Sequence, residues 1–349
     1  MSWLRNHKNL VCRLAVGAAA LSLTCFIWTG VQLYRDRKIL EAEIAARNHG
    51  KQYEVQEDSM CSFSGDVVEY KGKQYRRNSY VKAILCMGID RSGNMTEKTT
   101  TGFGGQADGL FLIAQDTVRN TVKILMIPRD TMTDIMLTDL SGNELGKDMQ
   151  HLNLAYAYGD GREKSCEYTK QAVSHLLMGL EIDSYMAADL EIIASLNDEV
   201  GGVSVTIPTI GMEKADPEFV FGKTVRLKGE QAERFVRFRD IGRDNSAISR
   251  MEQQKLYISG FFQAVKEKSK TESSITEKLF EMSQDYMVTD MAKDEYLKLA
   301  INALEGEGLT SSSFKMAPGT GTATETYDEY YVDQEALVPI LLDLFYREA

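Results

Sequence analysis

The sequence predicts an α/β fold with a mixed central β-sheet sandwiched by helices, behind one N-terminal transmembrane helix. Three observations support this prediction. Short apolar runs alternate with segments of helical periodicity through most of the chain, an order typical of α/β sandwiches. One uncharged stretch near the N-terminus is long enough to cross a bilayer. The 349 residues suffice for such an anchor followed by one large domain or two small ones.

The predicted anchor is residues 14–34 (LAVGAAALSLTCFIWTGVQLY), which contain no charged side chain. Trp28 and Tyr34 lie toward its far end, where interfacial aromatic residues are expected. A cleaved signal peptide is the alternative, but the run is long for one and no small-residue cleavage site precedes Arg35. Basic residues flank both ends and only weakly favour a cytoplasmic segment 1–13 with the remaining chain outside the cell.

The composition argues against several classes of protein. A net charge of −11 does not suit a nucleic-acid-binding protein, which needs a broad basic surface. The four histidines and five cysteines form no metal-ligand pattern, and there is no CxxC, so a zinc site is not expected. Cys61 and Cys166 could pair, although their spacing cannot show it. No Ser-His-Asp or Cys-His arrangement indicates acyl transfer through a protein nucleophile.

Residues 35–78 are predicted to form a charged stalk and an accessory hairpin, VVEYKGKQYRR (67–77), around a Lys-Gly turn. The large domain is predicted to span residues 79–349. Its first strand, VKAILCMGI (81–89), is a continuous apolar run typical of a strand buried on both faces.

Charged residues follow or precede the next predicted strands, 110–114 and 122–127. Asp90 and Arg129 each lie at the end of a predicted strand, and Asp108 lies at the start of one. In open α/β sheets the ligand crevice lies beyond the carboxyl ends of the strands. Each residue alone could belong to a solvated loop, but together they predict a site at this edge.

The remaining pattern alternates helices with short strands. We expect a helix over 163–178, a strand over 185–188 and then a helix that ends at about residue 197. A strand over 203–207 follows. Helical segments after residues 235–255 are expected to end at about residue 282, and a last one spans 293–304. The apolar C-terminal segment 333–346 is expected to pack as a covering helix.

A local excess of arginine marks residues 235–255 (FVRFRDIGRDNSAISRMEQQK). Asp244 opens a helix-start signal. On the helix that follows, Arg250 and Gln254 lie one turn apart near the positive N-terminal end. Forked guanidinium donors at a helix N-terminus suit a phosphate or pyrophosphate. A solvated basic turn is the alternative for this stretch taken alone.

Seven motifs occur in a fixed order: LCMGIDR (85–91), QADGLFLIAQD (106–116), IPRDT (127–131), LNLAYAYG (152–159), GGVSV (201–205), LKGEQAERFVRFR (227–239) and RMEQQ (250–254). With one N-terminal membrane span, this set resembles the LytR-CpsA-Psr (LCP) family. The resemblance extends from about Ser79 to the C-terminus and implies an LCP-type α-β-α catalytic domain.

Members of that family are membrane-anchored ligases on the outer face of the cytoplasmic membrane of Gram-positive bacteria. They transfer glycopolymers, such as teichoic acid or capsule, from a polyprenyl-(pyro)phosphate carrier to peptidoglycan. The resemblance implies that Asp90 and Asp108 bind Mg²⁺ or shape the site around it, and that a hydrophobic channel takes the polyprenyl tail. It also implies that the lipid pyrophosphate is held by Arg129, Arg237, Arg239, Arg250 and Gln254.

The chain departs from the family pattern at three places. The usual Arg-Ser-Asp-Thr reads Gln-Ala-Asp-Gly at 106–109, and the second arginine of Arg-x-x-Arg-Gln is Gln253. The family's acid before that motif falls near Ala247, where Asp244 is the nearest carboxylate. Arg91 and Arg243 could replace the lost charge. These departures leave the usual substrate and full activity open.

The chemistry implied is phosphoryl transfer to a sugar hydroxyl. The leaving phosphate gains charge, which arginines such as Arg129 and a metal ion can stabilise. The hydroxyl must lose a proton, for which Asp108 or Asp244 are the candidate bases. A receptor for lipid-linked glycans without turnover, or a polyprenyl-pyrophosphate hydrolase, remain alternatives.

Overall fold

The computed structural model describes residues 61–64, 66–91, 93–240, 246–323 and 328–349. The chain divides into two compact units, Met1–Glu54 and Val55–Ala349, and the description below concerns the second. The predicted anchor at 14–34, Arg243 and Asp244 lie outside the described residues. No helix within the described ranges has the length and apolar character needed to cross a membrane.

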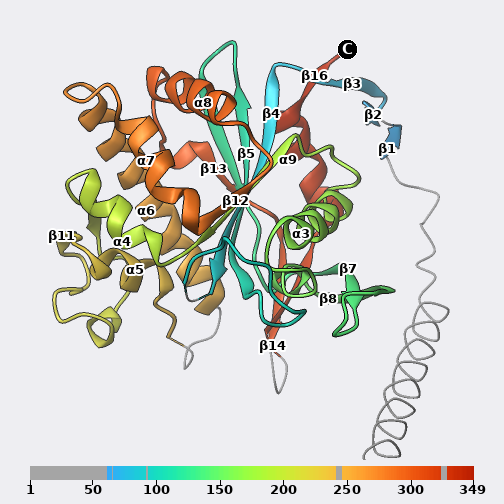
Figure 1. Ribbon diagram of the computed structural model, residues 1–349. Helices are drawn as coiled ribbons and strands as arrows, with labels where there is room; N and C mark the ends of the chain where they lie inside the picture. Colours follow the sequence, from blue (N-terminus) through green and yellow to red (C-terminus); the bar gives the residue numbers. More distant parts are fainter. Residues whose placement is uncertain (1–60, 65, 92, 241–245, 324–327) are drawn as a thin grey trace, which may run out of the picture. The chain divides into compact units, whose positions relative to one another are not determined.

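Six strands form the central sheet of the domain (Figure 1). Across the sheet, their order is β12 (Met287–Thr289), β9 (Ser184–Asp189), β4 (Val81–Asp90), β5 (Gln106–Asp116), β6 (Thr121–Met126) and β13 (Phe314–Met316). The pairs β4–β9 and β6–β13 are parallel, whereas β5 is antiparallel to both its neighbours and β12 is antiparallel to β9. The carboxyl ends of β4, β6 and β9 and the start of β5 therefore meet at one edge, as predicted for a mixed sheet.

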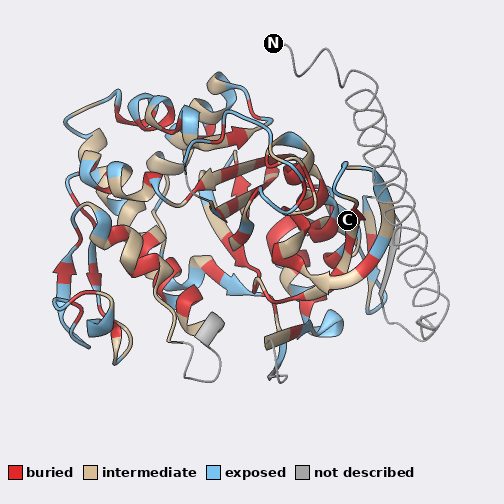
Figure 2. Cartoon of the chain, turned by 60° about the horizontal axis from the view of Figure 1, so that its bottom comes forward, coloured by how far each residue is buried: buried red, intermediate tan, exposed pale blue. Residues whose placement is uncertain are grey.

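Helices cover both faces of this sheet, which confirms the predicted mixed α/β sandwich (Figure 1). One layer consists of α6 (Ser246–Ser269), α7 (Ile275–Ser283) and α8 (Lys293–Glu305), and the other of α3 (Glu163–Leu176) and α9 (Gln334–Phe345). Figure 2 shows buried residues concentrated along the strands and on the inner sides of the helices. The Asp333 side chain caps α9 by accepting a hydrogen bond from the Ala336 amide. The apolar residues of α9 are buried, as expected for a covering helix.

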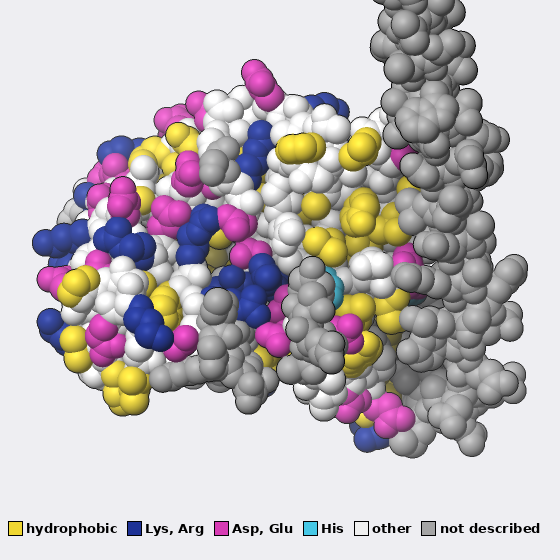
Figure 3. Space-filling model, turned by 90° about the horizontal axis from the view of Figure 1, so that it is seen from below, with side chains coloured by type: hydrophobic (Ala, Val, Ile, Leu, Met, Phe, Trp, Pro, Cys, Tyr) yellow, Lys and Arg dark blue, Asp and Glu magenta, His cyan; other side chains and the backbone are white. Residues whose placement is uncertain are grey.

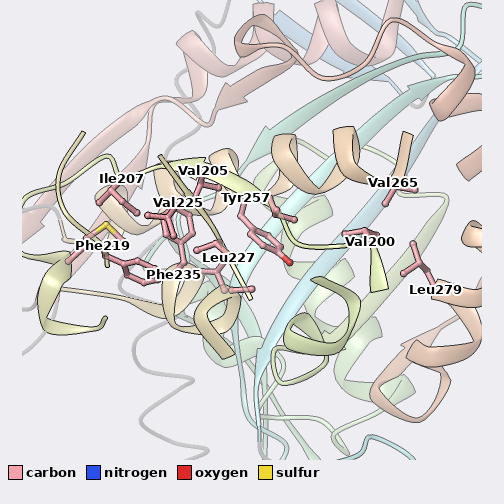
Figure 4. Close-up of a cluster of buried hydrophobic side chains, with 14 of the residues drawn as sticks. Val200, Val205, Ile207, Phe219, Val225, Leu227, Phe235, Tyr257, Val265 and Leu279 are labelled. Carbon is pink, nitrogen blue, oxygen red and sulfur yellow. The ribbon is translucent and has the colours of Figure 1, made fainter. Parts of the chain in front are cut away.

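A small subdomain holds the end of α5 in place. It contains α4 (Ile192–Glu199), β10 (Ser204–Thr206), β11 (Thr224–Arg226) and α5 (Glu230–Arg237). Figure 4 shows its apolar cluster, in which the rings of Phe219 and Phe235 meet edge to face with centroids 5.9 Å apart. Both rings are fully buried. Since Phe235 lies two residues before Arg237, this packing fixes the position at which the chain leaves α5 toward Arg239.

The predicted accessory hairpin is β2 (Val67–Tyr70) and β3 (Lys73–Arg77). Its turn is closed by Lys71 and Gly72, both with positive φ. The hairpin lies in a four-stranded sheet with β1 (Cys61–Ser64) and the last strand, β16 (Tyr346–Glu348), which pairs with β3. The C-terminal strand thus belongs to the same sheet as the N-terminal hairpin.

Two further hairpins were not predicted from the sequence: β7 (Met132–Thr138) with β8 (Glu144–His151), and β14 (Gly319–Ala323) with β15 (Asp328–Val332). The sequence GTGTA of β14 has little β propensity, so tertiary packing decides its conformation. A Cβ at Gly319 would lie 2.2 Å from the Tyr331 carbonyl oxygen. The remaining short elements are the 3₁₀ helices η1 (Leu152–Ala155), η2 (Met212–Lys214), η3 (Gln284–Tyr286) and η4 (Ser311–Ser313).

Cys166 lies buried on α3 with a free thiol, and burial raises the pKa of that thiol. The disulfide bond considered for this residue is therefore not formed.

Candidate functional site

A β-bulge presents Asp108 at the carboxyl end of β4. Gly88 pairs with Gly109, and the next residue, Ile89, pairs with Ala107, so Asp108 has no partner across the strands. A bulge re-aims a side chain, and such bulges are frequent beside active sites. The sequence placed Asp108 at a strand start, but residue spacing gives no signal for the bulge.

Asp108 lies between two arginines, Arg129 and Arg250, which we call the inner arginine pair. Its Oδ1 accepts from Arg129 Nη1, and its Oδ2 accepts from Arg250 Nη1 at 3.0 Å. Arg129 also donates from Nε to Asp130 Oδ1 at 3.1 Å. The Thr131 hydroxyl donates to the Pro128 carbonyl at 2.6 Å and closes the turn that carries Arg129.

The inner arginine pair is largely withdrawn from solvent. The exposed fraction of the side chain is 8% for Arg250, 12% for Asp108 and 20% for Arg129. Burial lowers the pKa of Arg250, whereas the Asp108 carboxylate opposes that shift. An arginine remains protonated in proteins even so. The inner pair is thus a partly buried, charge-compensated unit built from β5, the β6 end and α6.

Arg237 and Arg239 form a second group, the outer arginine pair. Arg237 ends α5 and donates to Asp90 and, at 3.2 Å, to Glu233. Arg239 Nη2 donates to Asp328 Oδ2 at 2.9 Å. Their side chains are 33% and 23% exposed. Figure 3 views the end of the molecule where these elements meet and shows Lys and Arg side chains gathered beside Asp and Glu.

Gln253 braces the helix of the inner pair against the segment of the outer pair. It is 1% exposed, and its amide nitrogen, oriented by the surrounding acceptors, donates to the carbonyls of Phe235 at 2.8 Å and Phe238 at 3.1 Å. These carbonyls lie at the C-terminal end of α5, where helix carbonyls lack intrahelical partners. The amide that replaces an expected arginine therefore does not point at a ligand.

The other predicted polar residues take distinct positions. Gln254 is 7% exposed and lies near Gly109, where a Cβ would be 3.7 Å from its Nε2. Gln106 is exposed, and its Oε1 accepts from Asn153 Nδ2 at 2.9 Å. Arg91 donates to the Gly161 carbonyl at 3.4 Å and thus contacts a loop outside the two arginine pairs.

Sequence reasoning missed Asp189, the last residue of β9. It is fully buried; Oδ1 accepts from the Glu191 amide at 2.8 Å, whereas no partner for Oδ2 is found in the described part of the chain. Burial raises the pKa of Asp189 to about 6, and the charges of Glu191 and Glu233 act in the same direction. The hydrogen bond from the Glu191 amide and the charge of Arg237 oppose this rise. Its position at the end of a strand beside β4 was the available signal.

The two predicted metal ligands differ in access. The Asp90 side chain is 49% exposed and contacts Arg237 through Oδ1, whereas both Asp108 oxygens are engaged by the inner arginine pair. Among the described residues, no three His, Cys, Asp or Glu side chains form a group that could hold a metal. Mg²⁺ usually takes one or two protein carboxylates and completes its shell with water and phosphate oxygens. Of the two carboxylates, Asp90 is therefore the more accessible to a metal ion.

An apolar cavity of about 340 Å³ lies between the sheet and helices α6 to α8. The sheet contributes Ile84, Cys86 and Ile113, and α6 contributes Ile258, which is one turn beyond Gln254. Burial raises the pKa of the Cys86 thiol to about 12, so the thiol is neutral. Helix α6 thus leads from the charged edge of the sheet into an apolar chamber.

Comparison with known proteins gives a consistent assignment. Two relatives are polyisoprenyl-teichoic acid–peptidoglycan teichoic acid transferases. One, TagV of Bacillus subtilis (strain 168), is 27% identical over 240 residues, 64% of this chain. The other, TagU of Bacillus cereus (strain ATCC 14579), is 28% identical over 264 residues, 73% of this chain and 74% of the relative. This chain spans about half of TagV, 53% of its length.

Solved structures show the same fold. The crystal structure of B. subtilis TagV matches with a TM-score of 0.55 and 23% identity, covering 76% of this chain and 97% of that one. TagT bound to LI-WTA matches with a TM-score of 0.57 and 17% identity, covering 76% and 90%. The LytR_cpsA_psr family matches residues 39–343. This protein therefore belongs to the LytR-CpsA-Psr family.

Proposed function

We propose that this chain is a phosphotransferase that moves a glycopolymer from a polyprenyl-(pyro)phosphate carrier to peptidoglycan. The observation that carries the proposal is the adjacency, along α6, of the charged site and the apolar cavity. Arg250 and Gln254 lie on the first turns of this helix, and Ile258 and Phe261 line the cavity further along it. A lipid pyrophosphate has the matching two parts, an anionic head and an isoprenoid tail. The names of the TagU and TagV relatives describe the same class of transfer.

The outer arginine pair is the part of the site best suited to exchange partners. Ion pairs at the surface contribute only about 0–1 kcal/mol. The pairs of Arg237 with Asp90 and of Arg239 with Asp328 are partly open to solvent, so a phosphate can replace the carboxylate in each. The inner pair keeps Asp108 and presents the remaining guanidinium donors to the phosphate. Together the two pairs provide forked donors from several directions.

The reaction is attack of an acceptor hydroxyl of peptidoglycan on the phosphorus that carries the glycopolymer. The new bond joins the acceptor oxygen to phosphorus, the bridging P–O bond breaks, and polyprenyl phosphate leaves with the bond electrons. Negative charge grows on the leaving phosphate, and Arg129, Arg237, Arg239 and Arg250 are the cations positioned to stabilise it.

We further propose that Asp90 and Asp108 hold Mg²⁺ together with phosphate oxygens. The bound ion would neutralise part of the phosphate charge. Asp90→Asn should weaken Mn²⁺ binding, used as a paramagnetic probe for Mg²⁺, while leaving the apolar cavity intact. Unchanged Mn²⁺ affinity in both Asp90→Asn and Asp108→Ala would contradict this ligand set.

We propose that the domain lies on the outer face of the cell membrane. Residues 14–34 would be the single span, residues 1–13 cytoplasmic, and the domain outside. Protease added to intact, wall-stripped cells should then digest the domain. Complete protection in sealed cells would place the domain inside and contradict this topology.

The activity itself can be tested with the full chain in detergent, a polyprenyl-pyrophosphate-linked glycan and peptidoglycan. Glycan joined covalently to peptidoglycan is the predicted product. Free sugar phosphate would identify a hydrolase, and unchanged bound lipid would identify a receptor without turnover. Either of these last two results would reject the transferase.

A further inference from the structure

The hairpin β14–β15 is docked against the turn that carries Arg129. The Tyr330 amide donates to the Asp130 carbonyl at 2.9 Å, and Tyr330 forms a parallel bridge with Thr131. The Tyr330 hydroxyl donates to the Ala317 carbonyl at 2.8 Å. Because Tyr330 is buried, the start of β15 has a fixed place beside the inner arginine pair.

Asp328, the first residue of β15, reaches from this hairpin to the outer arginine pair. Its carboxylate accepts from Arg239, and its backbone carbonyl lies 3.0 Å from His151 Nε2. Among the described residues, Arg239 and His151 are the charged or titratable groups that contact it. Asp328 therefore links the β14–β15 hairpin to Arg239, which follows α5 and lies far from the hairpin in the sequence.

The site carboxylates differ in their ability to accept a proton from an incoming hydroxyl. Both oxygens of Asp108 are bound by guanidiniums, and Asp130 and Asp189 are buried. Asp90 contacts Arg237, which also holds Glu233. The Asp328 side chain is 41% exposed and, among the described residues, pairs with one arginine. Asp90 shares these features at 49% exposure, but it is assigned to the proposed Mg²⁺ site, whereas Asp328 is not. Asp328 therefore combines access from solvent with a position beside a phosphate-binding guanidinium.

Phosphate binding would change the environment of Asp328. The Arg239–Asp328 ion pair is partly open to solvent, and a guanidinium binds phosphate through two parallel hydrogen bonds. The substrate therefore takes Arg239 and releases the carboxylate. A carboxylate that loses a cationic partner becomes a better proton acceptor. The released group lies next to the phosphate that is to be attacked.

We propose that Asp328 is the general base of the transfer and is released for this role when the substrate phosphate binds Arg239. This inference rests on the proposed transferase function. The proton of the acceptor hydroxyl moves to the Asp328 carboxylate as the acceptor oxygen bonds to phosphorus. The bridging P–O bond breaks, and its electrons leave with polyprenyl phosphate.

The test separates turnover from binding in the full chain. The donor is farnesyl-pyrophosphoryl N-acetylglucosamine with peptidoglycan as the acceptor, and the binding probe is farnesyl pyrophosphate. Asp328→Asn should lower kcat by roughly 10²–10⁴-fold, the usual contribution of a general base. The dissociation constant of farnesyl pyrophosphate should stay the same or become up to about tenfold smaller, because a competing negative charge is removed. Asp328→Glu should recover part of kcat.

The neighbouring Glu329→Gln is the matched control, since Glu329 accepts from the exposed Tyr331 hydroxyl and contacts no site arginine in the described structure. It should leave both constants unchanged. Wild-type kcat in Asp328→Asn would overturn the base assignment while the transferase proposal stands. A tenfold or larger loss of farnesyl pyrophosphate affinity would also overturn it, because Asp328 would then only position Arg239. Absence of transfer by the wild type with the probe bound would instead reject the transferase proposal.

Discussion

The inner and outer arginine pairs contain the same side chain and lie at the same edge of the sheet, yet they are held differently. In the inner pair, Arg250 is 8% exposed and shares the Asp108 carboxylate with Arg129. In the outer pair, Arg237 and Arg239 are three to four times as exposed as Arg250 and contact different acids. The strength of an ion pair depends on its desolvation, so equal distances do not imply equal roles.

This difference in burial predicts different roles for the two pairs, one in folding stability and the other in ligand binding. Removing one partner of a buried pair leaves an uncompensated charge, whereas an exposed charge is solvated when its partner is lost. The inner pair should therefore contribute to folding stability as well as to ligand binding. The outer pair should contribute mainly to binding. Substitutions at Arg250, Arg239 and Gln253 test this division, and one at Asp189 tests the buried acid beside the outer pair.

Arg250→Ala should have the largest effect on stability. Loss of one partner of a buried pair costs about 3–5 kcal/mol, and we expect the lower end because Arg129 still contacts Asp108. Urea unfolding of the full chain, followed by far-UV circular dichroism, measures this cost. Lys255→Ala on the same helix is the control, since Lys255 pairs with the half-exposed Glu252. Equal stability of the two variants would show that the inner pair does not support the fold.

Arg239→Ala should weaken farnesyl pyrophosphate binding by roughly tenfold to a hundredfold, because a hydrogen bond to a charged group contributes about 1.5–3 kcal/mol. Arg239→Lys should recover only part of this binding, since lysine keeps the charge but lacks the fork. Titration calorimetry measures the affinity. The free energy of unfolding without ligand should change by no more than about 1 kcal/mol. A large stability loss with unchanged affinity would make Arg239 a structural residue.

Gln253→Leu should affect both arginine pairs, because Gln253 joins α6 to the end of α5. Leaving the Phe235 and Phe238 carbonyls without this donor should cost about 1–3 kcal/mol of folding stability. Farnesyl pyrophosphate affinity should fall as well, since Arg237 and Arg239 flank Phe238. Gln263→Leu, at a position where the amide meets the exposed Glu267 on the same helix, is the control. A stability loss without any loss of affinity would limit Gln253 to a structural role.

The effect of Asp189→Asn should be visible only as a change in the pH dependence of folding stability. The pKa of Asp189 is raised to about 6 in the fold, so the folded chain binds more protons than the unfolded chain between about pH 4 and 6. Its contribution to stability is present below the unfolded pKa and is lost as pH rises through the folded pKa. At about 1.4 kcal/mol per pKa unit, a rise from about 4 to about 6 corresponds to a loss of roughly 3 kcal/mol.

The measurement is the free energy of unfolding of wild type and Asp189→Asn at pH 4 and pH 7.5. We expect the variant to gain stability relative to wild type as pH rises. A difference that does not vary with pH would mean that burial does not perturb this carboxyl group.

Much of the fold followed from local sequence pattern. The apolar run at 81–89 and the alternation of strands and helices identified the central sheet and its layers. Strand ends also placed Asp90, Asp108 and Arg129 at one edge, because side chains beyond parallel strands converge whatever the loops between them do. These inferences use short-range periodicity, which a single sequence contains.

The sequence did not reveal which acid each arginine contacts. The bulge at Asp108 depends on the register between β4 and β5, and Asp328 reaches Arg239 only through the docking of a glycine-rich hairpin. The interpretation of Gln253 as a lost cation assumed that its side chain faces the ligand, whereas it donates to α5 carbonyls. All three are long-range features that local propensity does not encode.

The most direct test of the account is a crystal structure of the full chain with farnesyl pyrophosphate. We predict that the pyrophosphate oxygens contact Arg237 and Arg239, while Asp108 stays between Arg129 and Arg250. The farnesyl chain should pass Ile258 into the cavity between the sheet and helices α6 to α8. A pyrophosphate bound away from the outer arginine pair, or a cavity left without the farnesyl chain, would contradict the proposed site.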